Sequence, residues 1–355
     1  MFNLHATGAT GRRGTILTAH GPIETPCFMP VGTGGAMRGI TFSELESLGA
    51  QILLCNTYHL HLRPGSDLIE RAGGLHSYLG WPKPIITDSG GFQVFSLKGL
   101  RKIEDHGVSF QSHIDGSPLF IGPEEAMHIQ HRLGADIIMC FDECPPSTAP
   151  RADQVKAVDR TLRWAKECKN AYGRLRAKKG EREASLLFGI VQGGLERDLR
   201  EKCAQELIAI GFDGYALGGL AVGETEDEML GMLDTVCPIL PKDAPRYLMG
   251  VGKIDQLRKC IARGIDIFDC VLPMREARHG RIFLSDGSVI DVLQNRYAED
   301  MTPIDGSSPS PLSHRHNRAY LRYLLKSGER LGETIACMQN LGVTLKTVDN
   351  IRSSL

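Results

Sequence analysis

Four polar side chains each follow directly after a short apolar run, and their types suit chemistry on a nucleoside. They are Asp88, Asp142, Gln192 and Asp269. Two carboxylates that face each other across a pocket can act as nucleophile and general acid or base at the anomeric carbon of a sugar. A third carboxylate beside a carboxamide can instead bind the edge of a nucleobase, accepting from its N–H groups while the amide donates to a ring carbonyl. The residue types alone leave open which acid has which role.

Eight apolar runs position these side chains. Each run is continuous rather than alternating, which is typical of strands buried on both faces of a parallel sheet. The runs are Cys27–Val31, Ile52–Cys55, Ile85–Thr87, Ile137–Phe141, Leu186–Val191, Tyr215–Leu217, Tyr247–Met249 and Ile265–Phe268. Segments with helical periodicity separate most of them, among them Pro123–Leu133 and 196–210. The alternation predicts an α/β fold, a (β/α)8 TIM barrel, with a doubly wound sheet as the competing arrangement.

A barrel would bring the four polar residues together. The carboxyl ends of its strands converge on one mouth, so side chains far apart in sequence surround one pocket there. Glycines also follow several runs, as in Gly193-Gly194 and Gly218-Gly219, and they allow backbone to approach a flat ligand closely. Glycine and aspartate also form simple turns after strands. Their recurrence at so many strand ends favours the pocket.

Composition bounds the class of protein. The chain has 355 residues, 42% hydrophobic and 23% charged, which is typical of globular proteins. The N-terminus lacks a basic segment followed by an apolar run, and no apolar stretch could span a membrane, so we predict a soluble, cytoplasmic protein. The ten cysteines show no C-x-x-C spacing, which indicates reduced thiols. A net charge of −1 argues against non-specific coating of nucleic acid, although 174–182 and 275–281 are locally basic.

Two segments are predicted to form hairpins inserted into the barrel. Phe110–Phe120 carries an Asp-Gly turn between alternating runs and follows the third strand. Arg281–Ile290 follows the eighth strand and contains a second Asp-Gly turn. Both would lie outside the parallel sheet.

Six motifs in this chain resemble those of the bacterial tRNA-guanine transglycosylases, also called queuine tRNA-ribosyltransferases. They are Thr87–Leu97, Phe141–Cys144, Phe188–Gly193, Gly214–Glu224, Tyr247–Gly252 and Phe268–Pro273. The resemblance runs from about residue 5 to about residue 340 and implies a (β/α)8 barrel with insertions. It implies a catalytic barrel at 1–290, with N-terminal and inserted hairpins, and a C-terminal subdomain with closing helices at 291–355.

The resemblance also implies an activity and the residues that perform it. Guanine at the wobble position (34) of tRNAs with a GUN anticodon would be exchanged for a modified base. Asp269 would be the nucleophile at C1′, giving a covalent enzyme–tRNA intermediate, and Asp88 the general acid or base. Residues matching the family's base-binding set are Phe92, Asp142, Gln192, Gly219, Leu220 and Met249. Arg275 and Arg278 would hold the tRNA around a flipped nucleotide.

The incoming base is predicted to be preQ1. Cys144 and Val222 resemble the bacterial branch of the family. A valine at the pocket wall leaves space for a small aminomethyl group but crowds the cyclopentenediol of queuine. Glu224 would orient the peptide that accepts the ammonium. The partners implied are therefore tRNA, guanine or preQ1 and a second copy of the chain in a homodimer, with no membrane.

The sequence departs from the family at its zinc subdomain. Alignment through 317–325 puts Ser308, Ser310, Ser313 and Gln339 at the four ligand positions. Neutral hydroxyls and an amide bind zinc poorly compared with thiolates and imidazoles, so we predict no metal and no cofactor. His314 and His316 lie nearby and leave a different metal geometry as the lesser alternative.

A further departure is Glu276, which adds a negative charge beside the presumed path of the RNA and bears on tRNA affinity. Three other functions compete with preQ1 exchange. One is a non-catalytic tRNA-binding subunit, which would not need Asp88 and Asp269. The second is a glycosidase of free nucleosides, which would not need Arg275 and Arg278. The third is a variant that uses queuine.

Overall fold

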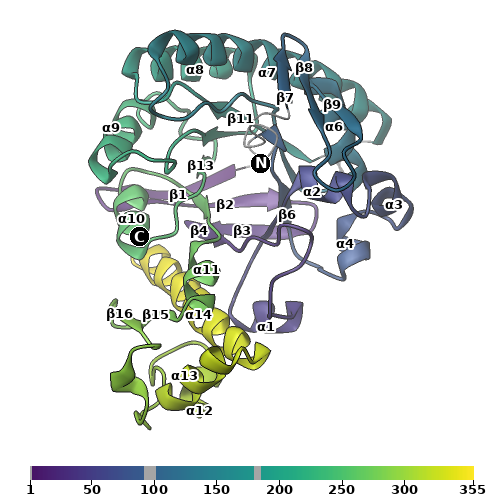
Figure 1. Ribbon diagram of the computed structural model, residues 1–355. Coiled ribbons are helices and arrows are strands. Elements are labelled where there is room, and N and C mark those ends of the chain that lie inside the picture. Colours follow the sequence, from purple (N-terminus) through teal and green to yellow (C-terminus); the bar gives the residue numbers. More distant parts are fainter. Residues whose placement is uncertain (1, 92–100, 180–184) are drawn as a thin grey trace.

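The centre of the molecule is an eight-stranded parallel sheet. A computed structural model describes residues 2–91, 101–179 and 185–355 (Figure 1). The strands are β4 (Cys27–Met29), β5 (Leu53–Cys55), β6 (Ile85–Thr87), β10 (Ile137–Met139), β11 (Leu186–Val191), β12 (Gly214–Leu217), β13 (Arg246–Leu248) and β14 (Ile267–Asp269). They pair in the order β4-β14-β13-β12-β11-β10-β6-β5. A parallel bridge between Val31 and Leu54 joins the two outer strands, so the sheet curves into a barrel. The prediction of a (β/α)8 barrel is confirmed, and the doubly wound alternative is wrong.

Continuous apolar runs form these strands because both faces of the sheet are buried. Met139, Phe188 and Ile190 belong to a cluster inside the barrel, together with Ile16 and Ile23 from the N-terminal region. Alternate residues of the same strands, such as Ile138 and Leu187, belong to the cluster between sheet and helices. Side chains of a strand point alternately to its two faces, so a strand covered on both sides has no place for a polar residue until it ends.

Helices form the outer layer. They are α1 (Phe42–Ser47), α2 (Thr57–Leu62), α3 (Ser66–Arg71), α4 (Leu75–Leu79), α6 (Pro123–Leu133), α7 (Arg151–Lys179), α8 (Arg197–Ile210), α9 (Glu226–Val236), α10 (Ile254–Ile261) and α11 (Leu272–Arg278). Helix α6 shows how local sequence sets their limits. It begins at Pro123 with two glutamates in its first turn and ends at Gly134, which has a left-handed φ of 71°.

Three small antiparallel sheets surround the barrel. The N-terminal one contains β1 (Phe2–Gly8), β2 (Gly11–Thr18) and β3 (Gly21–Thr25). The second contains β7 (Arg101–Glu104), β8 (Gly107–Gln111) and β9 (Pro118–Ile121), and the third contains β15 (Arg281–Phe283) and β16 (Val289–Asp291). Both predicted hairpins are therefore confirmed, and the first gains β7 as a third strand.

A buried carboxylate attaches the N-terminal sheet to the barrel. Asp136 accepts hydrogen bonds from the backbone N–H groups of His20 and Ile85 and contacts the imidazoles of His20 (2.9 Å) and His76 (3.0 Å). Burial opposes its charge, but the hydrogen bonds from His76, Ile85 and His20 outweigh that effect and lower its pKa to about 2. The two imidazole rings are stacked 3.4 Å apart at 12°. One metal ion would have to lie in the plane of both rings, so this arrangement suits hydrogen bonding.

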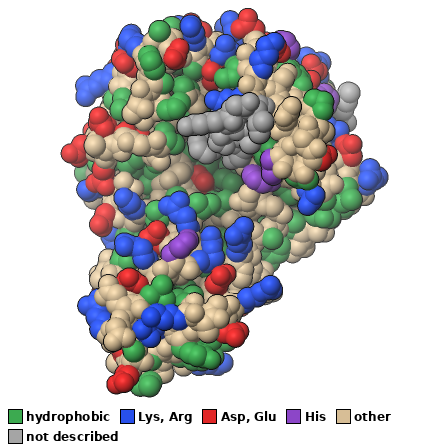
Figure 2. Space-filling model, viewed as in Figure 1, with side chains coloured by type: hydrophobic (Ala, Val, Ile, Leu, Met, Phe, Trp, Pro, Cys, Tyr) green, Lys and Arg blue, Asp and Glu red, His purple; other side chains and the backbone are tan. Residues whose placement is uncertain are grey.

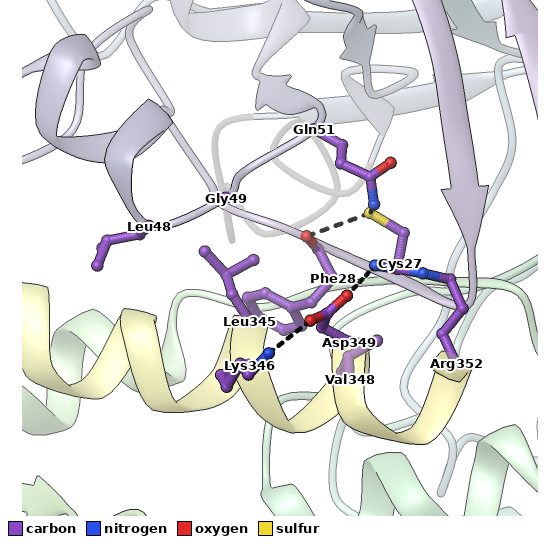
Figure 3. A pocket seen from close by; sticks show the side chains of 10 residues that line it. All are labelled: Cys27, Phe28, Leu48, Gly49, Gln51, Leu345, Lys346, Val348, Asp349 and Arg352. Carbon is purple, nitrogen blue, oxygen red and sulfur yellow. Dashed lines mark hydrogen bonds and ion pairs between the residues drawn. The ribbon is translucent and has the colours of Figure 1, made fainter. Parts of the chain in front are cut away.

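The C-terminal region begins with η2 (Asn295–Tyr297), α12 (Pro311–Arg315) and α13 (Arg318–Ser327) and ends with the long α14 (Arg330–Ser353). Helix α14 packs along α11, α10, β15 and β4. A cavity of about 140 Å³ lies where it meets Cys27 and Gln51 (Figure 3). The predicted division at residue 290 stays a prediction, because α14 contacts the barrel as well as its own subdomain.

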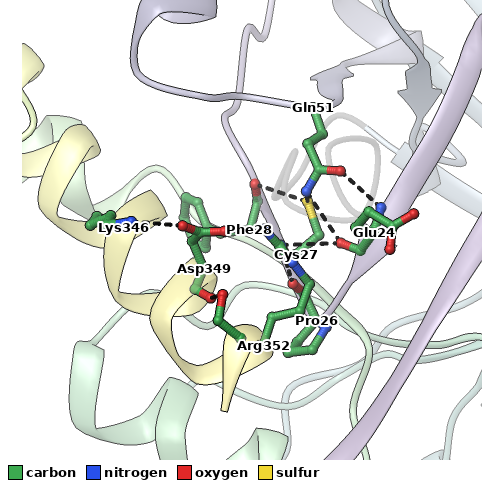
Figure 4. A network of polar contacts seen from close by, with 9 residues as sticks. Glu24, Pro26, Cys27, Phe28, Gln51, Lys346, Asp349 and Arg352 are labelled. Carbon is green, nitrogen blue, oxygen red and sulfur yellow. Dashed lines mark hydrogen bonds and ion pairs between the residues drawn. The ribbon is translucent and has the colours of Figure 1, made fainter. Parts of the chain in front are cut away.

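The end of α14 is bound to the start of β4 by polar contacts. Arg352 donates to the backbone oxygens of Glu24 (3.3 Å) and Pro26 (3.0 Å) and pairs with Asp349 (Figure 4). Gln51 donates to the oxygen of Glu24 and accepts from its N–H. These contacts attach the C-terminus to the barrel wall.

None of the helices in the described part of the chain combines the length and apolar character that crossing a bilayer requires.

Candidate active site

Each predicted polar residue at the barrel mouth follows a strand at its carboxyl end. Asp88 follows β6, Gln192 follows β11, Asp269 ends β14, and Asp142 lies three residues after β10. The Gln192 amide donates to the Asp142 carboxylate at 2.7 Å. After burial, the charges of Asp269 and Asp88 both raise the pKa of Tyr247, so these two acids lie near one phenol. The structure thus brings together the acids that the sequence grouped.

Asp269 has one oxygen held and the other available. Oδ1 accepts hydrogen bonds from the Tyr247 hydroxyl (2.6 Å) and the Gly250 N–H (3.0 Å). Within the described residues, no hydrogen bond is made to Oδ2. Burial raises the pKa of Asp269, and the donors Tyr247 and Gly250 oppose that rise. A carboxylate anchored through one oxygen is suited to attack through the other.

Asp88 is held by the segment that opens α2. Its Oδ1 accepts from the N–H groups of Thr57 (2.8 Å) and Gly90 (3.2 Å), and its Oδ2 accepts from the Asn56 side chain. The side-chain oxygen of Asn56 in turn accepts from the backbone N–H of His59 at 3.0 Å and contacts the His59 imidazole at 2.6 Å. Sequence reasoning missed Asn56 and Tyr247 as supports. An amide directly after β5 was the available signal for Asn56.

Asp142 and Gln192 form a buried pair deeper in the mouth. Asp142 also accepts from the Ser89 hydroxyl at 2.9 Å. Burial outweighs the hydrogen bonds from Gln192 and Ser89 and raises the pKa of Asp142 to about 6. Gly219 lies against this pair with φ of +65°, and a Cβ there would approach the Gln192 Oε1 to 2.7 Å. A side chain at this position would strain the backbone and press on the Gln192 amide.

The remaining predicted base-binding residues lie at or after the carboxyl ends of β10, β12 and β13. Burial raises the pKa of Cys144, next to Gly219, to about 12, so its thiol is neutral. Leu220 is buried, Met249 is half-buried against the barrel interior, and Val222 is 38% exposed. Glu224 accepts from the N–H groups of Ala221 and Val222, and Ala221 has a left-handed φ of 59°. Phe92 lies outside the described residues.

The two arginines predicted to bind RNA lie on the helix that follows β14, the strand that ends at Asp269. Arg275 and Arg278 are on α11, which begins three residues after Asp269. Figure 2 shows Lys and Arg side chains gathered over this region of the surface. Glu276 pairs with Arg281 at 2.5 Å, so its charge is compensated within α11 and the following strand. This pair neutralises one positive charge of the basic surface, and the effect of Glu276 on tRNA affinity stays a prediction.

The chain is similar to known proteins along almost its whole length. A family model described as Queuine tRNA-ribosyltransferase matches residues 7–355. A protein named Queuine tRNA-ribosyltransferase from Halothermothrix orenii is 50% identical, covering 100% of this chain and 93% of that protein. One of the same name from Acetivibrio thermocellus is 50% identical over 97% of this chain and 90% of that protein. Another from Novosphingobium aromaticivorans is 46% identical over 100% and 94%.

Asp142 is predicted to lower stability as the pH rises. Its folded pKa of about 6 lies above the value for an exposed aspartate, so the folded state keeps a proton that the unfolded state has lost between about pH 4 and 6. Stability falls across that window by about 2–3 kcal/mol. Asp142→Asn has no charge to bury, so its Tm relative to wild type should be about 3–5 °C higher at pH 7.5 than at pH 4.5.

Thermal unfolding of both proteins at the two pH values measures this difference. Asp136→Asn is the control, because Asp136 has a lowered pKa and is ionised in both the folded and the unfolded state above about pH 4, so this substitution should lower Tm by a similar amount at both pH values. A Tm difference for Asp142→Asn that stays constant with pH would contradict the assignment.

Proposed function

The chain belongs to the queuine tRNA-ribosyltransferase family, and we propose that it exchanges guanine at wobble position 34 of GUN-anticodon tRNAs for preQ1. The observation that carries this proposal is the pair of separately anchored carboxylates, Asp269 and Asp88, beside the buried Asp142–Gln192 pair. Asp269 and Asp88 act at the sugar, and the Asp142–Gln192 pair binds the base. The tRNA substrate, the cytoplasmic location and a homodimer are parts of the same proposal.

Exchange proceeds in two displacements at C1′ of the target nucleotide. The Asp269 Oδ2 attacks C1′, forming a C–O bond while the bond from C1′ to N9 of guanine breaks and its electron pair leaves with the base. Asp88 supplies a proton to the departing guanine. It then takes the N9 proton of the incoming base, which attacks C1′ and releases Asp269. Both acids return to their starting states, so no cofactor is consumed.

The Asp142–Gln192 pair selects the base. The Asp142 carboxylate accepts from the ring N–H and the exocyclic amine of a guanine-like edge, while the Gln192 amide and the Gly219 N–H donate to the ring carbonyl. In the free protein the Gln192 amide donates to Asp142, so the two groups satisfy each other until a base replaces that contact. A site built on these hydrogen bonds rejects bases that lack the matching donors.

The peptide between Leu220 and Ala221 supports preQ1 as the incoming base. Its N–H is directed at Glu224. Because a trans peptide places N–H and C=O on opposite sides, the Leu220 carbonyl points away from Glu224 and is available as an acceptor. A carbonyl in that orientation suits the ammonium of an aminomethyl group. The anchored carboxylates support catalysis over a non-catalytic subunit, and the α11 arginines support tRNA over a free nucleoside.

Asp269→Asn should lower guanine exchange by at least about a thousandfold, because an amide is a poor nucleophile. Incorporation of radiolabelled guanine into unmodified tRNA measures this rate, and a denaturing gel detects the covalent tRNA adduct. Tyr247→Phe is the matched variant. It keeps the nucleophile but removes one donor to Oδ1, so it should slow exchange only about tenfold. If Asp269→Asn exchanged guanine at the wild-type rate, another residue would be the nucleophile.

PreQ1 should be incorporated at least about a hundredfold more efficiently than queuine, because Val222 crowds the cyclopentenediol. Competition between the two radiolabelled bases measures this ratio. Glu224→Gln should lower kcat/KM for preQ1 about tenfold and that for guanine much less, since the amide holds the Leu220 peptide less well. Equal incorporation of queuine and preQ1 by wild type would overturn the choice of base while leaving guanine exchange intact.

A further inference from the structure

Arg200 is a fully buried arginine behind the base-binding residues. It lies on α8 and its side chain is 0% exposed. Its Nη1 donates to the backbone oxygens of Val191 (2.8 Å) and Gly218 (2.8 Å), and its Nε donates to Gly194 (2.9 Å). One rigid guanidinium therefore joins the ends of β11 and β12. Its partners are carbonyls, with no carboxylate among the hydrogen bonds described for it.

The backbone bound by Arg200 leads directly into Gln192, whose side-chain amide pairs with Asp142. Gln192 directly follows Val191, and Gly219 directly follows Gly218. The Gln192 amide packs on this glycine pair so closely that a Cβ at Gly218 would approach its Nε2 to 2.5 Å. A shift of either strand end would therefore move the amide from its place beside Asp142. Displacements well under 1 Å matter for hydrogen-bonded recognition.

Burying this charge is unfavourable. Desolvation lowers the pKa of Arg200 to about 10, which still leaves the group charged at neutral pH. Its Nη2 is also buried without a hydrogen-bond partner among the described residues. Carbonyl ligands do not neutralise the charge, but an apolar side chain would leave these carbonyls without the donors that Arg200 supplies. The planar guanidinium of an arginine can donate to three carbonyls at once.

We propose that Arg200 is a positioning residue that sets the affinity and selectivity for the base, through the relative placement of Gln192 and Gly219. This inference rests on the proposed function and adds a residue outside the barrel mouth to it. Arg200 does not touch the base. Its effect is expected on base binding and much less on tRNA binding, which involves α11.

The test compares Arg200→Lys with Arg12→Lys. Lysine keeps the charge but cannot reach three carbonyls. Arg12 is a matched control, because it is also buried and binds the Ala244 oxygen (2.7 Å) and Asp266 (2.9 Å) at the opposite end of the barrel. Calorimetry measures guanine binding, exchange kinetics give KM for tRNA, and hypoxanthine measures selectivity for the exocyclic amine.

Arg200→Lys should weaken guanine binding at least about tenfold and narrow the preference for guanine over hypoxanthine, with KM for tRNA within about twofold of wild type. Arg12→Lys should lower Tm without changing guanine affinity. If Arg200→Lys does not fold, Arg200→Gln provides the same comparison. Unchanged guanine affinity in a folded variant would overturn the inference. Failure of the wild type to bind guanine would instead overturn the proposed function.

A second inference rests on the C-terminal subdomain, where the side chains at the family's zinc positions do not fit a metal. Ser308, Ser310, Ser313 and Gln339 are all buried, at 4% exposure or less. None is a thiolate or an imidazole. The Gln339 amide nitrogen, a donor, is directed at the Phe283 oxygen (2.7 Å) and the Asp305 carboxylate (2.9 Å). The Gln339 Oε1 and the hydroxyl oxygens of Ser310 and Ser313 are buried without a hydrogen-bond partner among the described residues, but neutral oxygens of this kind are poor zinc ligands.

Neighbouring groups do not supply the missing ligands. The His314 Nε2 contacts the Ser308 backbone oxygen at 2.7 Å, and the His316 ring packs against Tyr320. The Cys337 thiol, on the same helix as Gln339, contacts the Met274 oxygen. Each of these side chains is directed at another partner. The lesser alternative of a histidine-based metal site therefore gains no support.

Asp305 joins the parts that a metal would otherwise join. Its carboxylate accepts from the Ser285 N–H (2.8 Å) and hydroxyl (2.7 Å), the Ser307 N–H (3.0 Å) and the Gln339 amide. These donors belong to the β15–β16 hairpin, the loop before α12, and α14. Although burial opposes it, the hydrogen bonds lower the pKa of Asp305. We infer that this carboxylate holds the subdomain together without a metal.

Two measurements test metal independence. Purified wild-type protein should contain no stoichiometric zinc, and its Tm should not change with 1,10-phenanthroline. Asp305→Asn should lower Tm by about 5 °C, because the amide accepts fewer of the four hydrogen bonds. Asp286→Asn is the matched control, since Asp286 is an exposed carboxylate in the same hairpin and, among the described residues, makes its hydrogen bonds to Ser288 alone. Stoichiometric zinc, a chelator-dependent Tm or an unaffected Asp305→Asn would each overturn the inference.

Discussion

Closure of the barrel between β4 and β5 is the constraint on which the site depends. In the order of the sheet, β14 and β6 are separated by five strand spacings, roughly 24 Å in an open sheet at ~4.8 Å per strand. The bonds from Gly32 to the Leu54 oxygen (2.8 Å) and from Leu54 to the Pro30 oxygen (2.9 Å) join the outer edges. Only β4 and β5 then separate the two strands, so Asp269 and Asp88 come near the same Tyr247 phenol. Opening this seam would separate the two acids without changing either.

The carboxylates of the barrel differ in whether hydrogen bonds outweigh burial. At the amino ends of the strands, Asp136 has enough donors to outweigh burial and its pKa falls, whereas burial raises the pKa of Asp266 to about 6 despite its contact with Arg12. At the mouth, burial dominates at Asp142 and Asp269, and their pKa values rise. The mouth therefore holds charge that the fold itself does not fully compensate. Such groups lower stability but gain interaction when a ligand with N–H donors or a developing positive charge enters.

Support for the site comes from residues that do not face it. Arg200 joins two strand ends from an outer helix, and Asn56 joins Asp88 to the start of α2. In the C-terminal subdomain, Asp305 has a comparable role, connecting a hairpin, a loop and a helix through one side chain. In each case one polar group with several acceptors or donors joins different segments of the chain. Because these segments are fixed, the functional groups that they carry have defined positions.

The sequence by itself determined the eight strands, the polar residue at the end of each site strand and the two Asp-Gly hairpins. These features are local, because continuous apolar runs and turn residues act within a few positions. It also puts three serines and a glutamine at the positions that the resemblance assigns to zinc, and the chemistry of these side chains is the basis for proposing a subdomain without a metal. Tertiary structure alone decided which donors hold each acid. Tyr247 meets Asp269 across 22 positions, and Asn56 meets Asp88 across 32. It also paired Glu276 with Arg281 and placed Arg200 behind Gln192, because only a closed barrel brings the ends of different strands, and the helices behind them, within hydrogen-bonding distance.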